Sequence, residues 1–121
     1  MTPVVAVVDD DTSMLQSLGD LLESAGYAVR LFPSAASLLN DDNLASIDCL
    51  VTDIGMPVVD GLELNRIVQR RRAGLPVILI TGHEVTDQML ASVREAHDCF
   101  RKPFNDHELL AAVRDAIGSV K

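Results

Sequence analysis

Five short strand-like runs, each followed by a segment with helical periodicity, constrain the fold of this chain more than any other feature. The runs cover residues 4–8, 27–32, 47–52, 77–80 and 98–101. After each run, apolar residues recur every three or four positions, as on one face of an amphipathic helix. Nearly continuous apolar strands joined by helices are typical of a parallel sheet covered on both faces. Because crossovers between parallel strands are right-handed, the sequence predicts a doubly wound α/β fold with a five-stranded parallel sheet.

The segments between the runs carry signals for helix starts and ends. Asp11, Thr12 or Ser13 can cap a first helix by accepting hydrogen bonds from free backbone N–H groups, and we assign the cap to Asp11. Gly26 can end this helix, and Ser34 can open a second one. Three further helices are expected from about residue 61, over residues 85–96 and over residues 106–119. The sequence therefore predicts a βα unit repeated five times.

The composition indicates one globular domain without a nucleic-acid surface. A chain of 121 residues, with 48% hydrophobic and 23% charged residues, is large enough for one core. A formal net charge of −8 disfavours binding to phosphate backbones, which attract basic surfaces. Arg66 and residues 70–72 form a basic cluster, which we interpret as the solvated end of a helix. We therefore treat residues 1–121 as one domain that does not itself bind nucleic acid.

The sequence carries no evident signal for secretion or membrane insertion. Its N-terminus lacks the basic and long apolar regions of a secretory leader, and the apolar run at residues 75–80 is too short to span a bilayer. A cytoplasmic location is the default expectation. Cys49 and Cys99 lie in apolar, strand-like contexts without metal-type spacing. In a reducing compartment, we expect both to be buried free thiols.

Polar side chains occur where four of the expected strands end. Asp9 and Asp10 follow the first run, and Asp53 follows the third. Thr81 follows the fourth run, and Lys102 follows the fifth, directly before a proline. Because open α/β sheets bind ligands at the C-terminal ends of their strands, these five side chains are expected to meet. Three carboxylates, a hydroxyl and an ammonium together predict a site for a divalent cation and a phosphoryl group.

The chemistry of this set favours phosphoryl transfer. Clustered carboxylates repel one another unless a cation neutralises them, and Mg²⁺ prefers one or two carboxylates together with phosphate oxygens. One of three consecutive aspartates suffices as a helix cap, which leaves Asp9 and Asp10 for metal binding. Asp53 is the candidate nucleophile, because a carboxylate can attack phosphorus to form an acyl phosphate. Thr81 could donate its hydroxyl to a phosphoryl oxygen, and Lys102 could neutralise another.

Four motifs resemble those of receiver domains from bacterial two-component response regulators, over essentially the whole chain. They are Val-Val-Asp-Asp at 7–10, Thr-Asp-Ile-Gly-Met-Pro-Val-Val-Asp-Gly at 52–61, Ile-Thr-Gly-His at 80–83 and Lys-Pro-Phe at 102–104. The second motif is especially specific, since it combines a strand-ending aspartate with Met-Pro and glycine at fixed spacing. The resemblance implies a flavodoxin-like (βα)5 fold with strand order 2-1-3-4-5.

The resemblance also implies a phosphoacceptor rather than an enzyme that acts on a separate substrate. A sensor histidine kinase or phosphotransfer protein would phosphorylate Asp53, and the domain would slowly dephosphorylate itself. Mg²⁺ would be held by Asp10, Asp53 and the backbone carbonyl of Gly55, with Asp9 supporting the ion through water. The peptide bond before Pro103 would be cis.

The implied switch involves the last two βα units. Phosphorylation would draw the Thr81 hydroxyl toward the phosphoryl group and alter the surface formed by residues 85–96, 98–101 and 106–119. That surface could carry a homodimer contact, or bind an output domain or partner protein. Here Cys99 occupies the position of the family's aromatic residue, and the neighbouring Phe100 should face the other side of the sheet. The segment before Lys102 is also about one residue short of the family pattern.

Three alternatives remain open. A phosphatase of the haloacid dehalogenase type uses similar chemistry, but it places an Asp-x-Asp motif after its first strand. A flavodoxin-type flavin carrier shares the fold, but the carboxylates of residues 9–11 would repel a flavin phosphate. A receiver-like interaction module that works without phosphate is the third alternative, and Cys99 favours it. Within the receiver interpretation, Gly55 and His83 could tune the access of water to the phosphorylated aspartate.

Overall fold

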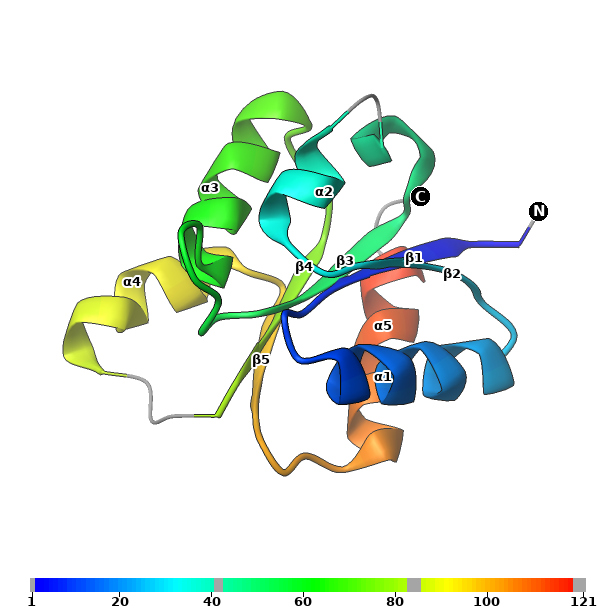
Figure 1. Ribbon diagram of the computed structural model, residues 1–121. Helices are drawn as coiled ribbons and strands as arrows, with labels where there is room; N and C mark the ends of the chain where they lie inside the picture. The colour runs from blue at the N-terminus through cyan, green and yellow to red at the C-terminus, as the bar shows by residue number, and fades with distance from the viewer. Residues whose placement is uncertain (1, 41–42, 83–85, 119–121) are drawn as a thin grey trace.

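The computed structural model describes residues 2–40, 43–82 and 86–118, which form a five-stranded sheet covered by helices (Figure 1). The strands lie in the order β2-β1-β3-β4-β5, and all four pairings are parallel. They are β1 (Val4–Val8), β2 (Ala28–Phe32), β3 (Cys49–Asp53), β4 (Val77–Thr81) and β5 (Asp98–Arg101). The helices are α1 (Thr12–Ser24), α2 (Ala35–Leu39), the 3₁₀ turn η1 (Asn43–Ser46), α3 (Gly61–Arg71), α4 (Asp87–Glu95) and α5 (Asp106–Gly118). This architecture confirms the predicted doubly wound α/β fold and its flavodoxin-like strand order.

The core lies in two layers, one on each face of the sheet. One face is covered by α1 and α5 (Figure 1), and the core layer beneath them contains Val5 and Val7 of β1. On the other face, α2, α3 and α4 pack in the layer that contains Ala6 and Val8. Successive residues of a strand point to opposite faces, so β1 contributes to both layers. Every residue of β3 and β4 is buried, which explains why these strands have nearly continuous apolar sequences.

Side-chain caps begin the first two helices, as predicted. Asp11 Oδ1 accepts hydrogen bonds from the N–H groups of Ser13 at 2.9 Å and Met14 at 3.3 Å. Ser34 Oγ accepts a backbone N–H of α2 at 3.2 Å. Gly26 follows α1 with a φ of +95°, a left-handed conformation that glycine adopts without steric cost. These caps direct the chain from each strand end back over the sheet.

Some element boundaries differ from the predictions. β3 begins at Cys49 instead of residue 47, and it includes Asp53. α4 begins at Asp87, whereas its expected start at residue 85 lies outside the described residues, as does residue 119 at the expected end of α5. The turn η1 was not predicted, because four residues are too few to show a helical period. It is held by Asn43, whose side-chain nitrogen lies 2.8–3.2 Å from three carbonyl oxygens and shares its two N–H donors among them.

The basic cluster at the end of α3 is mostly exposed, as predicted, but two of its residues also bind carbonyl groups. Arg71, although exposed, donates to the carbonyl oxygen of Leu39 at 3.1 Å. The guanidinium of the half-buried Arg72 donates to the carbonyl oxygens of Leu44 and Ile47. Charged donors thus satisfy carbonyl groups at and just beyond helix ends, where such groups lack regular partners. The cluster therefore ties α3 to the connection between α2 and β3.

Both cysteines are free thiols, as predicted, but only Cys49 is buried, so the prediction that both thiols are buried is wrong for Cys99. Cys49 is fully buried, and this burial raises the pKa of its thiol to about 12. Cys99 is half-buried, and loss of hydration raises the pKa of its thiol as well.

In the described part of the chain, none of the helices has the length and apolar character needed to cross a membrane.

Candidate functional site

The ends of β1, β3, β4 and β5 bring the predicted site residues to one edge of the sheet. Asp53 is the last residue of β3 and pairs in register with Ile80 of β4. Thr81, the next residue of β4, accepts a backbone hydrogen bond at 2.7 Å from the N–H of Lys102, just beyond β5. Asp9 directly follows β1, the neighbour of β3 on its other side. Parallel pairing therefore gathers side chains that are far apart in the sequence.

One ammonium group lies between two carboxylates at this edge. Lys102 Nζ is 3.6 Å from Asp9 Oδ2 and 3.6 Å from Asp53 Oδ1. Both aspartates are buried, whereas the Lys102 side chain is 23% exposed. In this partly buried setting, the two ion pairs are screened less than they would be on an open surface. Asp53 therefore has beside it a cation able to stabilise negative charge brought to its carboxylate.

Three carboxylates lie close enough together to hold a divalent cation. One oxygen each from Asp9, Asp10 and Asp53 lies within 4.8 Å of the others. Asp9 Oδ1 accepts the N–H of Asp11 at 2.9 Å, but the buried Asp9 Oδ2 receives no hydrogen bond from any described residue. A buried carboxylate oxygen in this state is costly, and a cation would stabilise it. The oxygen donors of this cluster fit Mg²⁺, which binds a few carboxylates and keeps waters for the remaining positions.

Burial raises the pKa of Asp9 above its ordinary value of 3.8. Loss of hydration is the largest cause, and the negative charges of Asp53 and Asp10 act in the same direction. The hydrogen bond from Asp11 and the positive charge of Lys102 act in the opposite direction. Without a metal ion, the ionised form of Asp9 therefore destabilises the fold.

Replacing Asp9 with asparagine is expected to stabilise the metal-free protein near neutral pH, because the amide avoids the cost of burying an ionised carboxylate. Because its pKa is raised on folding, the folded protein binds more protons than the unfolded chain between pH 3.8 and that higher pKa. Stability is therefore lost as the pH rises through this window, and the advantage of D9N should grow over the same range. Urea unfolding in EDTA at about pH 3 and about pH 7 measures the difference. D115N, at an exposed position of α5, is the control, and an equal gain in both variants would contradict this prediction.

The connection between β3 and α3 packs closely against the backbone of Asp53. A Cβ at position 61 would lie 2.3 Å from the carbonyl oxygen of Asp53 and 2.8 Å from the Cα of Ile54. Gly61 N–H donates to the Ile54 carbonyl oxygen at 2.9 Å, and Asp60 caps α3 by accepting the N–H of Glu63 at 2.9 Å. Glycine is therefore required at position 61. The sequence motif included Gly61, but it did not predict the contact with the backbone of Asp53. The feature that could have predicted it is a glycine directly after the residue that caps a helix.

Val58 has a strained backbone within this connection. Its φ is +67°, a left-handed conformation that is disfavoured for β-branched residues, and its side chain is fully exposed. Replacing Val58 with asparagine or glycine is expected to stabilise the protein by about 1 kcal/mol, because strain is relieved and no buried contact is lost. Thermal unfolding measures the gain. The control is V59N, because Val59 is half-buried and packs on the core, so this variant should destabilise the protein. A loss of stability in both V58N and V58G would contradict the proposal that the Val58 backbone is strained.

Two residues were predicted to tune the reaction, and only one of them, Gly55, lies among the described residues. Gly55 is exposed two residues after Asp53, and a Cβ there would come to 4.0 Å from Asp53 Oδ2, an ordinary contact. His83 lies outside the described residues. The peptide bond between Lys102 and Pro103 is cis, as the resemblance implied.

The aromatic residue of β5 faces the α1–α5 layer. Phe100 packs in this layer, and its ring centroid lies 6.4 Å from that of Phe104. Cys99 packs in the opposite layer, which also contains Met89 and Val93 of α4. The predicted alternation is confirmed, so Phe100 points away from α4.

Comparisons with known proteins place the chain in a family. Residues 5–114 match the response regulator receiver domain. The response regulator protein TodT of Pseudomonas putida is 36% identical over 115 residues, which cover 94% of this chain and 51% of TodT. The transcriptional regulatory protein FixJ of Azorhizobium caulinodans is 42% identical over 115 residues, covering 94% of this chain and 54% of FixJ. A crystal structure of a response regulator receiver domain protein from Clostridium thermocellum matches with a TM-score of 0.90 and 31% identity, covering 97% of this chain and 95% of that chain.

The chain belongs to the receiver domain family of two-component response regulators. It spans about half the length of the curated relatives just described. Family membership is consistent with a phosphoacceptor role and does not support the phosphatase and flavin-carrier alternatives.

Proposed function

We propose that residues 1–121 act as one receiver domain, in which Asp53 accepts a phosphoryl group from a sensor histidine kinase or phosphotransfer protein. The observation that carries this proposal is the pair of 3.6 Å contacts that Lys102 Nζ makes with Asp9 and Asp53. Asp53 thus has a cation beside it, together with the acidic cluster that it forms with Asp9 and Asp10. Family membership supports the same role.

In the proposed reaction, a carboxylate oxygen of Asp53 attacks the phosphorus of a phosphohistidine. The new O–P bond forms as the P–N bond breaks, and the imidazole leaves with the electron pair and takes up a proton. Lys102 would neutralise one phosphoryl oxygen, and the Thr81 hydroxyl would donate a hydrogen bond to another. Water would later hydrolyse the acyl phosphate slowly, which releases phosphate and restores Asp53. The domain is therefore a phosphoacceptor rather than an enzyme that turns over a separate substrate.

We assign the Mg²⁺ of this reaction to Asp9, Asp10, Asp53 and the backbone carbonyl of Gly55. Asp10, Asp53 and the carbonyl would bind the ion directly, and Asp9 would support it through water. When bound, the ion would offset the charge of the acidic cluster and of the phosphoryl oxygens. The raised pKa of Asp9, and the burial of its Oδ2 without a hydrogen bond from any described residue, support this assignment.

We further propose that phosphorylation alters the α4-β5-α5 surface. Thr81 ends β4, pairs in register with Arg101 of β5 and is bonded through its backbone to Lys102, so a shift of Thr81 toward the phosphoryl group would reach β5. Through this surface the domain would contact an output domain, a partner protein or a second copy of itself. The greater length of TodT and FixJ supports an output domain beyond the receiver.

A phosphorylation-independent interaction module is the second candidate. Cys99 stands in the α4 layer where the family has an aromatic residue, and Phe100 faces the other layer. Because β5 places no aromatic side chain in the α4 layer, the usual link from Thr81 to the surface lacks one of its parts. Such a module would bind its partner equally well with and without a phosphoryl group.

Intact-protein mass after incubation with acetyl phosphate and Mg²⁺ tests the phosphoacceptor proposal. We expect a gain equal to one phosphoryl group, which disappears when EDTA removes the metal. A folded protein that gains no mass from acetyl phosphate or from phosphorylated kinases would contradict the proposal and favour the second candidate.

A further inference from the structure

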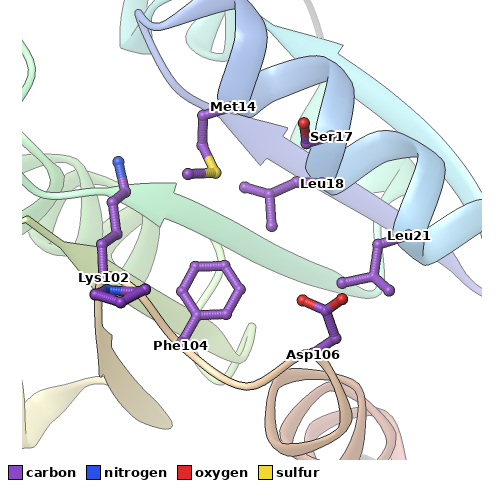
Figure 2. Close-up of a pocket in the computed structure, with 8 residues that line it drawn as sticks. Met14, Ser17, Leu18, Leu21, Lys102, Phe104 and Asp106 are labelled. Atoms are coloured by element: carbon purple, nitrogen blue, oxygen red, sulfur yellow. The ribbon is translucent and has the colours of Figure 1, made fainter.

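We propose that a cavity between α1 and the segment from Lys102 to Asp106 binds a small aromatic molecule that carries one hydrogen-bond donor. The cavity has a volume of about 260 Å³, and Lys102, which contacts Asp53, is one of the residues that line it (Figure 2). It is lined by Met14, Ser17, Leu18, Leu21, Lys102, Pro103, Phe104 and Asp106. Of these residues, the proposed phosphoryl transfer uses Lys102 alone, so the rest of the lining has no part in that chemistry.

The walls of the cavity are mostly apolar and come from two sides. Met14, Leu18 and Leu21 project from α1, and the Phe104 ring lies across from them (Figure 2). Phe104 packs in turn on Phe100, with ring centroids 6.4 Å apart and ring planes at 56°. Aliphatic side chains opposed to an aromatic ring favour a flat apolar ligand, which can contact both walls at once.

The volume limits the ligand to a small molecule. Apolar cavities of roughly 150 Å³ can take up benzene, so about 260 Å³ suits one ring or two fused rings. Drug-sized ligands occupy pockets of roughly 300 Å³ or more. A compact bicyclic molecule therefore matches the volume of this cavity.

Charges around the cavity select against an anionic ligand. Asp106 directs its carboxylate toward the cavity from the start of α5 (Figure 2). At the other end, the Lys102 ammonium is already shared between Asp9 and Asp53. An anion would therefore be repelled, whereas a neutral ligand with an N–H or O–H group can donate a hydrogen bond to Asp106.

A bound ligand would also affect phosphorylation, a consequence that rests on the proposed function. The Lys102 side chain forms part of the cavity wall, and its ammonium contacts Asp53. A molecule in the cavity restrains this side chain and so links the two sites. We expect saturating ligand to change the rate of loading by acetyl phosphate about twofold or more.

Indole is the probe for the cavity, because it is a neutral fused ring with one N–H donor. NMR titration of the unphosphorylated protein, followed at the Met14 methyl and the Phe104 ring, should give a Kd of about 1 mM or tighter. 1-Methylindole, which lacks the donor, should bind about fivefold more weakly. In D106A, the two probes should bind with equal affinity.

Two tryptophan variants separate this cavity from non-specific binding. S17W fills the cavity from an exposed position of α1 and should weaken indole binding about tenfold or more. A111W is the matched control, because it fills a second cavity of about 400 Å³ that is lined by Tyr27 and Arg114 among others, and it should leave binding unchanged.

Three results of the titration would overturn the proposed binding to this cavity. The first is that indole changes chemical shifts only around the second cavity. The second is that indole binds S17W and the wild type with equal affinity. The third is no binding at millimolar indole, which would suit a cavity that accepts only a side chain of a protein partner. The titration contains no phosphodonor, so a failure of Asp53 to accept phosphate would not alter the measured affinity for indole.

Discussion

Asp53→Asn is expected to gain no phosphoryl group from acetyl phosphate and Mg²⁺, under conditions in which the wild-type protein gains one. Asparagine has nearly the same size and shape as aspartate, so the strand end should keep its structure. Its neutral amide is a far weaker nucleophile than a carboxylate, and we expect the rate of transfer to fall by at least about 100-fold. Intact-protein mass measured over time, followed by mapping of the modified peptide, checks both the loss and the position.

Two control variants separate the acceptor from its surroundings. D115N changes an exposed carboxylate of α5 and should be phosphorylated at the wild-type rate. D10N keeps the proposed acceptor but removes one carboxylate of the acidic cluster, so it should load slowly and respond to higher Mg²⁺ concentrations. Wild-type mass gain in D53N would mean that another residue accepts the phosphoryl group, and the assignment to Asp53 would be wrong.

The edge of the sheet at which the site residues meet could be predicted from the sequence, because the C-terminal ends of parallel strands all lie at the same edge. Asp53 and Thr81 end strands that their apolar composition makes recognisable, and Lys102 follows a third. In a parallel sheet all such ends lie at one edge, so no side-chain detail is needed to bring the groups together. Recognition of the motifs then supplied the strand order, which periodicity alone leaves open.

The contacts within the site could not be predicted in the same way. The equal distances from Lys102 to Asp9 and Asp53 depend on side-chain rotamers and on burial, which no local pattern encodes. The basic cluster shows the same limit, because a charged helix end is usually solvated. Arg72 instead donates to carbonyl oxygens of the segment before β3, and that partner is chosen by tertiary packing.

Gly61→Ala is expected to lower the free energy of unfolding by about 3 kcal/mol, although alanine is the better helix former. The gain in helix propensity is at most about 1 kcal/mol. The new Cβ would lie 2.3 Å from the carbonyl oxygen of Asp53 and 2.9 Å from its carbonyl carbon, and backbone atoms cannot turn aside as a flexible side chain can. The clash therefore outweighs the propensity, and urea unfolding of the variant measures the difference.

Gly118→Ala is the matched control, since a Cβ at the end of α5 meets no atom within 4 Å. We expect this variant to be as stable as the wild type or slightly more stable. If G61A and G118A have the same free energy of unfolding, the loop after β3 can move without cost. In that case the loop does not hold the backbone of Asp53 in place. A large loss confined to G61A would instead mean that α3 braces the backbone of Asp53. In that case the folded fraction of G61A should also accept phosphate more slowly, because relief of the clash displaces the carboxylate from its position beside Lys102.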